Sequence, residues 1–308
     1  MATHRFTPSR YHLSIGSHEP ALRIADGDTV ITSTIDAHGY DETETQVTEA
    51  GNPMTGPFYV EGAEPGDTLV VTLDKIVPNR EYGWARTIVA PNVLEPEYVY
   101  HLPPEDDWKV ARWRIDAAAG TATLAEPADT MLGALVLPIE PMVGCFGVAP
   151  SRGQAISTAT SGEFGGNMDY RGFTEGVTAC FPVFVAGALF HLGDVHAVQS
   201  DGEIGGTGIE ISSEVQFSVQ LKKDAMVQWP GGEDERYVFT VGNARPLDQA
   251  VQHATTEMLR RLQREYRLDA ISARILMGQC VEYDVGNIFD PAYTMVCKIP
   301  KHLLPYVA

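Results

Sequence analysis

Cysteine is scarce in this chain, which has four cysteines in 308 residues. No two of them have the C-x-x-C spacing of zinc knuckles or of thiol oxidoreductases, so the sequence predicts neither. Each cysteine lies among apolar or small neighbours, which is typical of reduced, buried thiols and predicts a cytoplasmic protein. The four are Cys145, Cys180, Cys280 and Cys297.

Long apolar runs are also missing from the sequence. No run approaches the ~18 residues that a membrane-spanning helix needs. The first residues lack a basic stretch followed by an apolar one, so we expect no signal peptide. The sequence therefore predicts a protein without a membrane partner.

Basic residues are few compared with acidic ones. The chain has 22 Lys and Arg against 41 Asp and Glu, which gives a formal net charge of −19 and a pI near 4.8. Such a surface repels the phosphates of nucleic acids and of anionic lipids. We therefore expect no nucleic-acid partner.

Several short motifs of catalysis are absent as well. The chain has no G-x-S-x-G elbow, no P-loop, no dinucleotide-binding glycine pattern and no H-E-x-x-H. These absences argue against a serine hydrolase with a G-x-S-x-G elbow, and against nucleotide-binding enzymes that use a P-loop or a dinucleotide-binding glycine pattern.

Apolar residues, at 44%, are frequent enough for a sizeable core. Short β-prone runs are bounded by Gly, Pro, Asp or Asn, and some of them alternate in polarity. Residues 151–165 have little periodicity and predict a long loop. We expect strands at residues 22–24, 28–35, 68–76, 113–116, 121–124, 178–185, 188–192, 206–212, 215–221, 281–284 and 293–299.

Helices are predicted only near the end of the chain. Apolar residues recur every three or four positions from 247 to 266, which indicates an amphipathic helix. A second helix is expected over 270–277, with Asp269 as its N-cap. The fold class is therefore mostly β with a small C-terminal helical portion. We expect an N-terminal β region (1–155) and a second region (156–308) carrying most of the metal-site motifs, or one intertwined domain.

The segment 191–203 is the most informative part of the chain. It contains two His, two Asp and one Glu between two strand-like segments. Polar groups beside buried strands are costly, and imidazole and carboxylate suit Zn²⁺ or a similar divalent ion. The alternative is a polar hairpin turn, which the Ser-Asp-Gly sequence at 200–202 also fits.

Three other segments could carry chemistry. Residues 161–169 place Asn167 and Asp169 after a Gly-Gly pair that lets a small ligand approach the backbone, although an Asx turn is an alternative. Asp36 and His38 lie two residues apart, so on a strand both face one side; a solvated strand end is the alternative. Cys145 lies between glycines, where a catalytic thiol or a small buried hydrophobe is possible.

Four sequence blocks follow one another along the chain: GPFYVEGAEPGD (56–67), GCFGVAP (144–150), GGNMD (165–169) and the run 187–203. In this order they resemble the acetamidase/formamidase family of metal-dependent amide hydrolases, and the resemblance extends over roughly residues 20–300. It implies a β-sandwich-like fold with a C-terminal helical portion, and a divalent metal, with zinc as the expected ion. It also implies a small amide as substrate, cleaved to ammonia and a carboxylate, and a homodimer or higher homo-oligomer.

The resemblance also implies site residues at the matching positions. We interpret Glu203 as the general base, Asn167 as a donor to the oxyanion, and Asp201 as a group that orients the histidine ligand. The interpreted metal ligands are Asp36, Asp169, Asp194 and His196.

The chain departs from the family pattern at Ser200, His191, His38 and Tyr40. These changes leave the substrate open, and His38 or His191 is a candidate for a further ligand. Alternatives remain: a hydrolase of γ-lactams or other cyclic amides, acyl transfer by Cys145 without a metal, and a non-enzymatic ligand-binding β protein with a structural metal.

Overall fold

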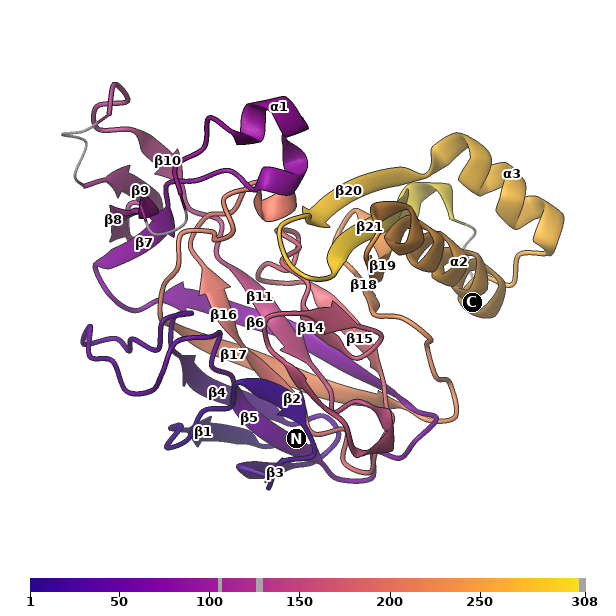
Figure 1. Cartoon of the computed structure of the whole chain (residues 1–308). Coiled ribbons are helices and arrows are strands. Elements are labelled where there is room, and N and C mark those ends of the chain that lie inside the picture. Colours follow the sequence, from indigo (N-terminus) through magenta and orange to yellow (C-terminus); the bar gives the residue numbers. More distant parts are fainter. Residues whose placement is uncertain (105–106, 126–129, 305–308) are drawn as a thin grey trace.

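The computed structural model describes residues 1–104, 107–125 and 130–304, and its architecture is built on two β-sheets (Figure 1). The larger sheet has nine strands, paired antiparallel except for the first two in its order. In sheet order these are β1 (Thr3–Phe6), β4 (Thr29–Thr34), β17 (Ser213–Lys222), β6 (Thr68–Pro78), β15 (Thr178–Pro182), β18 (Gly231–Glu233), β19 (Tyr237–Ala244), β21 (Tyr293–Pro300) and β20 (Glu282–Asn287).

The smaller of the two sheets has six strands. It is antiparallel apart from the parallel pair at one edge, β3 and β5. In sheet order its strands are β13 (Ser161–Gly162), β14 (Gly165–Asn167), β11 (Met142–Gly147), β16 (Phe190–His196), β5 (Thr55–Val60) and β3 (Leu22–Ile24).

In the larger sheet, strands from distant parts of the sequence lie next to one another. β17 lies between β4 and β6, although about 140 residues separate β17 from β6. Alternate residues of β17 are buried, as the polarity pattern predicts, because a strand turns successive side chains to opposite faces. Our division of the chain at residue 155 stays a prediction.

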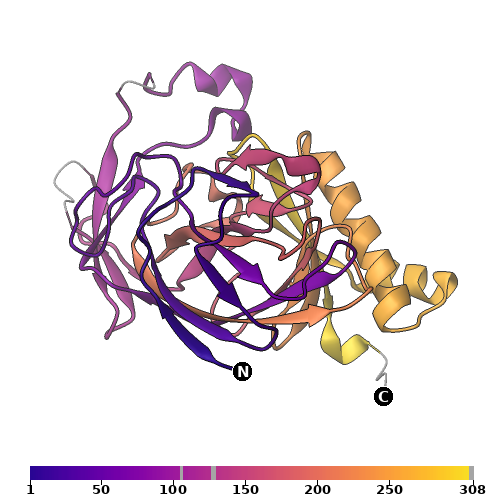
Figure 2. The same cartoon turned by 90° about the horizontal axis from the view of Figure 1, so that it is seen from below.

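Phenylalanine rings from the two sheets fill the space between them. Phe58 of β5 contacts Phe217 of β17, and Phe146 of β11 contacts Phe181 of β15, each pair with ring centroids 5.2 Å apart in edge-to-face geometry. All four side chains are fully buried. Figure 2 shows the sheets stacked as the layers of a sandwich, which confirms the predicted fold class.

Smaller elements extend from this sandwich. A four-stranded meander and the short helix α1 (Pro96–Val99) project from one end of it (Figure 1). Residues 14–16 and 155–157 pair as a two-stranded ribbon of β2 (Ser14–Gly16) and β12 (Ala155–Ser157). The meander has the order β10 (Val136–Pro138), β9 (Thr121–Leu124), β8 (Val110–Asp116) and β7 (Tyr82–Arg86).

Both predicted helices are present near the C-terminus. α2 (Leu247–Glu265) packs on β19 and β21, and its apolar stripe forms a second core with α3 (Ala270–Cys280). Asp269 caps α3 by accepting hydrogen bonds from the backbone N–H groups of Ile271 and Ser272, as the sequence predicts. Among the described residues, no helix is long and apolar enough to cross a membrane.

Three local predictions need correction. Residues 151–165 contain β12 and β13 rather than one long loop. The strand predicted at 188–192 starts at Phe190 and runs on to His196. Residues 206–212 form no strand but only isolated bridges at Glu210. A β-carbon on Gly208 would lie 2.6 Å from the His196 ring, so glycine serves close approach at this position.

Candidate metal centre

The last residues of β16 present two candidate ligands. Asp194 and His196 are two residues apart and both are buried. Asp194 has a φ of +57°, a left-handed conformation that non-glycine residues rarely adopt. Such strain is characteristic of functional sites, where the surrounding structure holds a side chain in a required direction.

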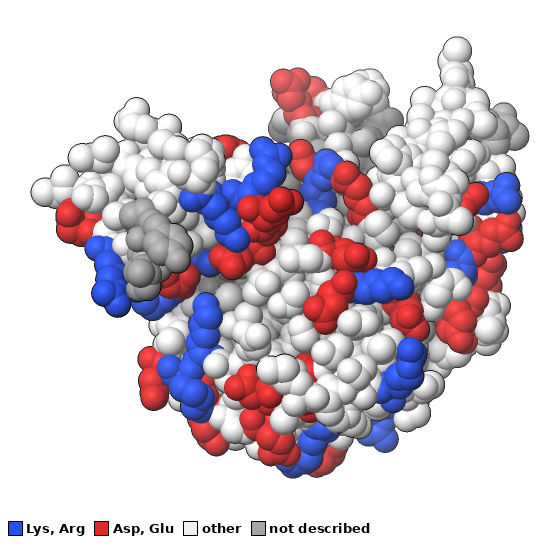
Figure 3. All heavy atoms as spheres, turned by 180° about the vertical axis from the view of Figure 1, so that it is seen from behind, with Lys and Arg blue, Asp and Glu red and all other residues white. Residues whose placement is uncertain are grey.

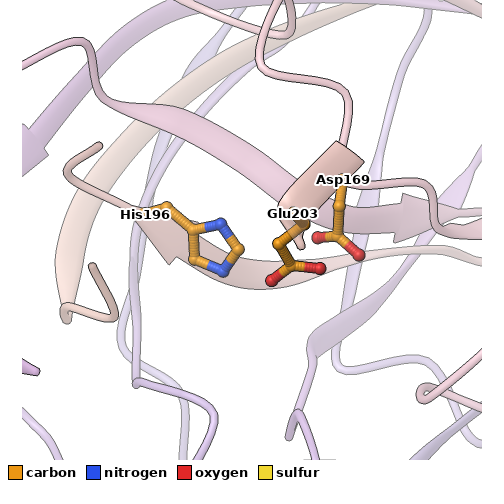
Figure 4. A group of neighbouring side chains, drawn as sticks. All are labelled: Asp169, His196 and Glu203. Atoms are coloured by element: carbon orange, nitrogen blue, oxygen red, sulfur yellow. The ribbon is translucent and has the colours of Figure 1, made fainter. Parts of the chain in front are cut away.

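Three further carboxylates come from outside β16. Asp169 follows β14, Glu203 lies in the 3-10 turn η5 (Asp201–Glu203), and Glu210 lies beside β16 through its bridge to His196. Asp169 and Glu203 also have positive φ values, +42° and +46°. Figure 4 shows the Glu203 carboxylate between the His196 ring and the Asp169 carboxylate.

These side chains form two overlapping groups that could hold a cation. Asp169, His196 and Glu203 form one group, and Asp194, His196 and Glu210 form the other. Within each group, one ligand atom from every residue lies within 4.8 Å of the others. The structure thus brings together Asp169, Asp194, His196 and Glu203, as the sequence predicts, and adds Glu210.

Several ligand atoms in these groups have no hydrogen-bond partner. The Nε2 atom of His196 is 2.9 Å from Oε1 of Glu210 and 3.5 Å from Oδ1 of Asp194. Neither contact has hydrogen-bond geometry, so Nε2 is unpartnered within the described residues. The same holds for Oδ1 of Asp169, Oδ1 of Asp194 and Oε2 of Glu210. Buried polar atoms that converge without partners fit a site for a cation.

Gln199 determines the tautomer of His196. Its side-chain N–H donates to the backbone carbonyl of Asp169, so its carbonyl oxygen faces the imidazole. That oxygen lies 2.8 Å from Nδ1 of His196 and can only accept, which places the proton on Nδ1. In the neutral ring that a metal ion requires, the lone pair of Nε2 is then directed at the carboxylates.

Asn287, which sequence reasoning missed, links three of the carboxylates. Its Nδ2 atom lies 2.8 Å from Oδ2 of Asp169, 2.7 Å from Oε2 of Glu203 and 2.8 Å from Oδ2 of Asp290. Its Oδ1 atom accepts from the backbone N–H groups of Phe289 and Asp290, which fixes the orientation of the amide. Asn287 is the last residue of β20 and Asp290 lies in the connection to β21, where the sequence shows only an ordinary polar turn.

Burial and mutual repulsion perturb the acidic groups of the cluster. Burial, reinforced by neighbouring carboxylates, raises the pKa of both Asp169 and Glu203 well above their usual range. Burial also raises the pKa of Glu210 to about 7 and that of Asp290 to about 6. Burial alone lowers the pKa of His196, but Glu210 and Asp194 raise it well above its usual value. A divalent cation would compensate so much buried negative charge.

The donor set fits a divalent metal ion. It combines one imidazole nitrogen with several carboxylate oxygens, the ligands that zinc and similar ions take in proteins. Three observations agree with this interpretation. Several ligand atoms have no hydrogen-bond partner, Gln199 fixes the tautomer of His196, and acidic residues of the groups have positive φ values. The structure thus supports a metal centre at the junction of β14, β16 and η5.

Asp36 lies in different surroundings from those we expected. Its Oδ1 accepts from the backbone N–H groups of His38 and Tyr40, and its Oδ2 accepts from Arg80 and from the Trp84 indole. Asp36 belongs to neither ligand group. Because both oxygens are engaged by these donors, the structure does not support Asp36 as a metal ligand. The contacts with Arg80 and Trp84 instead indicate that Asp36 positions β7.

Asn167 lies at the edge of the centre. Its amide nitrogen donates to Oδ2 of Asp290 at 2.6 Å, and its oxygen accepts from Asn52 at 3.2 Å. Asn52 also donates to Oδ2 of Asp194 at 3.1 Å. Both asparagines line the pocket beside the ligand groups, so Asn167 retains one N–H that a substrate oxygen could meet.

Asp201 and His191 do not contribute to the centre. Asp201 is exposed and pairs with Arg171 at 3.6 Å, so our expectation that it orients His196 is wrong; Gln199 has that position. His191 contacts the rings of His12 and His18 instead. His38 lines the pocket and stacks on Trp84, with ring centroids 3.8 Å apart.

Cys145 is completely buried in β11, and its thiol contacts the carbonyl oxygen of Thr158 at 3.7 Å. Burial, together with the charges of Asp194 and Asp169, raises its pKa well above the usual value. A nucleophilic cysteine needs the opposite, an accessible thiolate. The geometry therefore argues against catalysis by Cys145.

Comparison with known proteins identifies relatives of this chain. The sequence profile of the Acetamidase/Formamidase family matches residues 3–155 and 152–250. An acetamidase from Mycolicibacterium smegmatis is 29% identical over 247 residues, which is 63% of this chain and 59% of that protein. The chain thus covers less than two thirds of that relative's length.

Solved structures match over nearly the whole chain. The crystal structure of an acetamidase from Yersinia enterocolitica has a TM-score of 0.85 and 28% identity, and the match covers 99% of this chain and 93% of that one. A predicted acetamidase/formamidase from Thermoanaerobacter tengcongensis has a TM-score of 0.81 and 28% identity, with coverage of 98% and 97%.

Proposed function

Because this chain belongs to the acetamidase/formamidase family, we propose that it hydrolyses small carboxamides to ammonia and a carboxylate with the help of a divalent metal ion. One observation carries the metal dependence: unpartnered atoms of Asp169, Asp194, His196 and Glu210 converge in a buried space. Formamide and acetamide are the first substrates to test, since the names of the relatives point to them.

The ligand set of the proposed ion is drawn from the two groups described above. His196, through Nε2, belongs to both groups, and Asp169, Asp194 and Glu210 supply carboxylate oxygens. When bound, a divalent ion of this kind polarises an amide carbonyl and lowers the pKa of a coordinated water to ~7. The sharing of His196 between the groups favours one ion over two.

Glu203 is the proposed general base. It accepts a proton from water as the water oxygen bonds to the amide carbon, and it returns that proton to nitrogen as the carbon–nitrogen bond breaks. Asn287 holds one oxygen of the Glu203 carboxylate at 2.7 Å. A pKa raised by burial suits this role, because the group must take the proton from water and hold it until it transfers it to the departing nitrogen. Asn167 is the proposed donor to the oxygen that becomes negatively charged.

The test combines metal analysis with ammonia release from formamide and acetamide, before and after chelation. We expect a stoichiometric divalent metal and loss of turnover on chelation. Glu203→Gln should retain the metal and lower kcat by ~10²- to 10⁴-fold, the usual range for a lost general base. The matched control is Glu214→Gln on the exposed face of β17, which should leave kcat unchanged. Full turnover in the metal-free protein would refute the proposal.

A cyclic amide such as a γ-lactam is the second candidate substrate. The pocket beside the ligand groups has a volume of about 390 Å³, which is in the range of pockets for ligands far larger than acetamide. Opening a γ-lactam ring leaves the nitrogen on the product and releases no ammonia, so this reaction is followed by the amino acid formed. Comparing its rate with that of acetamide separates the two candidates.

Three finer properties are also proposals. Zinc is the proposed ion, because imidazole and carboxylate ligands in a small site suit it. A cytoplasmic location agrees with the four cysteines, none of which forms a disulfide. We further propose a homodimer or higher homo-oligomer, which size-exclusion chromatography with light scattering would test.

A further inference from the structure

The pocket beside the metal centre contains one arginine. Carboxylates line one part of it, Asp194, Glu203, Glu210 and Asp290 among them, and Arg86 is the only Lys or Arg that the described residues place in its lining. Formamide and acetamide have few non-hydrogen atoms and would leave much of the 390 Å³ empty. The pocket therefore has room for a substrate with a second functional group.

Arg86 is held in place at the end of β7. Its backbone N–H donates to the hydroxyl of Thr207 at 2.9 Å, and its guanidinium donates to the carbonyl of Gly206 at 3.4 Å. The guanidinium carbon lies 6.0 Å from the centroid of the Phe289 ring. These contacts place the Arg86 side chain beside residues 206–207 and Phe289, at the edge of the pocket.

The guanidinium of Arg86 carries more N–H groups than there are acceptor atoms near it. An arginine side chain carries five N–H donors, and in the described part of the chain only the Gly206 carbonyl accepts from that of Arg86. The described carboxylates include no ion-pair partner for Arg86. In contrast, Arg80 in the turn before β7 and Arg112 and Arg114 of β8 each have one. Arg86 is thus equipped to bind an anion with two parallel hydrogen bonds.

Arg86 can also be reached from outside the pocket. It lines a second hollow of about 740 Å³, whose walls include Ile88, Val93, Leu94 and Leu102. Because Arg86 belongs to both linings, it lies where the two hollows meet. A ligand entering along the second hollow would meet Arg86 before the metal centre.

We propose that Arg86 binds a carboxylate at the far end of the substrate, so that the preferred substrates are monoamides of short dicarboxylic acids. This inference rests on the proposed amide hydrolysis and names its substrate class. The amide end would lie at the ligand groups and the methylene chain along the stacked rings of His38 and Trp84. The chain carries a net charge of −19, and the face in Figure 3 shows many acidic side chains, so an anionic substrate needs a local cation.

The test compares two amides of equal chain length, butyramide and succinamate, in metal-loaded wild-type protein. Arg86→Gln removes the charge and Arg86→Lys keeps the charge without the planar fork. The matched control is Arg5→Gln, an exposed arginine on β1. We expect wild-type kcat/KM to be higher for succinamate, and the ratio of succinamate to butyramide to fall 10- to 100-fold in Arg86→Gln. A smaller fall is expected in Arg86→Lys and none in Arg5→Gln.

Direct binding separates this inference from the proposed function. Calorimetric titration with succinamate should show binding to wild type and at least tenfold weaker binding to Arg86→Gln. If the protein hydrolyses none of formamide, acetamide, butyramide and succinamate but this difference persists, the proposed hydrolysis fails and the carboxylate site stands. The inference is overturned if butyramide is the better substrate of wild type, or if Arg86→Gln leaves the ratio of succinamate to butyramide unchanged. Equal binding of succinamate to both proteins also overturns it.

Discussion

The side-chain oxygen of Gln199 lies 2.8 Å from Nδ1 of His196, and the other end of the same amide donates to the backbone of Asp169. One side chain thereby determines the tautomer of the only histidine in the ligand groups and ties it to the loop that carries an acidic ligand. The residues nearest to a metal are oriented by partners of this kind.

Gln199→Ala should weaken metal binding. Without the acceptor at Nδ1, His196 can place its proton on Nε2 and can rotate, so we expect a 10- to 100-fold loss in metal affinity. Competition with a chromophoric chelator measures it. Gln220→Ala, on the exposed side of β17, is the control and should bind metal as wild type does. Unchanged affinity in Gln199→Ala would show that the tautomer is set by other means.

Asp36→Asn should affect stability rather than metal content. Asp36 is fully buried and pairs with Arg80, which is itself almost inaccessible, so the variant leaves a buried guanidinium without its counter-charge. Breaking such a pair costs ~3–5 kcal/mol. Urea unfolding measures the loss, and metal analysis of the folded fraction should give the wild-type ratio. Asp194→Asn is the comparison, and in it the metal content should fall. A metal-free Asp36→Asn protein would restore Asp36 as a ligand.

The histidine cluster of His12, His18 and His191 should make the fold sensitive to acid. Burial, together with the neighbouring His18 and His12, lowers the pKa of His191 from 6.5 to about 3. The folded state thus requires the neutral imidazole. The stability it contributes is complete above pH 6.5 and is lost as the pH falls from 6.5 towards 3. Over this window the free energy of unfolding should drop by about 1.4 kcal/mol per pH unit for this one proton.

His191→Phe tests this pH dependence. The variant keeps an aromatic ring against His12 and His18, so its free energy of unfolding should fall less steeply with pH than that of wild type. Urea unfolding at several values between pH 7 and pH 4 gives both slopes. His302→Gln, at an exposed position, should retain the wild-type slope. Parallel curves for wild type and His191→Phe would contradict the prediction.

Cys145 should be dispensable for catalysis. Its thiol is buried and its pKa is raised, so native protein should be labelled by iodoacetamide at the partly exposed Cys280 and not at Cys145. Cys145→Ala should retain kcat within about threefold, since it removes one small group from the core. Mass spectrometry and ammonia release are the measurements. Inactivation by labelling of Cys145, with resistance to chelation, would instead favour acyl transfer to the thiol.

Much of the architecture was predictable because its signals are local. The alternation in β17 and the three- and four-residue spacing in α2 report which side of each element is buried. The N-cap Asp269 likewise acts on N–H groups two and three residues away. The prediction failed over 206–212, where apolar residues suggested a strand but Gly208 serves close approach to His196.

The candidate site was predictable only where its residues are neighbours in sequence. Asp194, His196 and Glu203 fall within ten residues, and the resemblance to the family added Asp169. Glu210 follows soon after, yet its position depends on a bridge that no local pattern reveals. The structure does not support Asp36 as a ligand, and the sequence could not reveal this, because a carboxylate that faces a cation and one that faces Arg80 have the same local pattern.

Local patterns are sufficient to specify a β-rich chain with two late helices and a dense group of imidazole and carboxylate side chains around residues 191–203. Spacing and composition are enough for that, because strand and helix periodicities are short-range. The tertiary fold selects which of these groups converge, because Asn287 reaches Asp169, and Asp290 reaches Asn167, across more than a hundred residues of chain. It also turned Asp36 towards Arg80 and left Arg86 beside the pocket, since the partners of a buried charge are chosen by how the sheets pack.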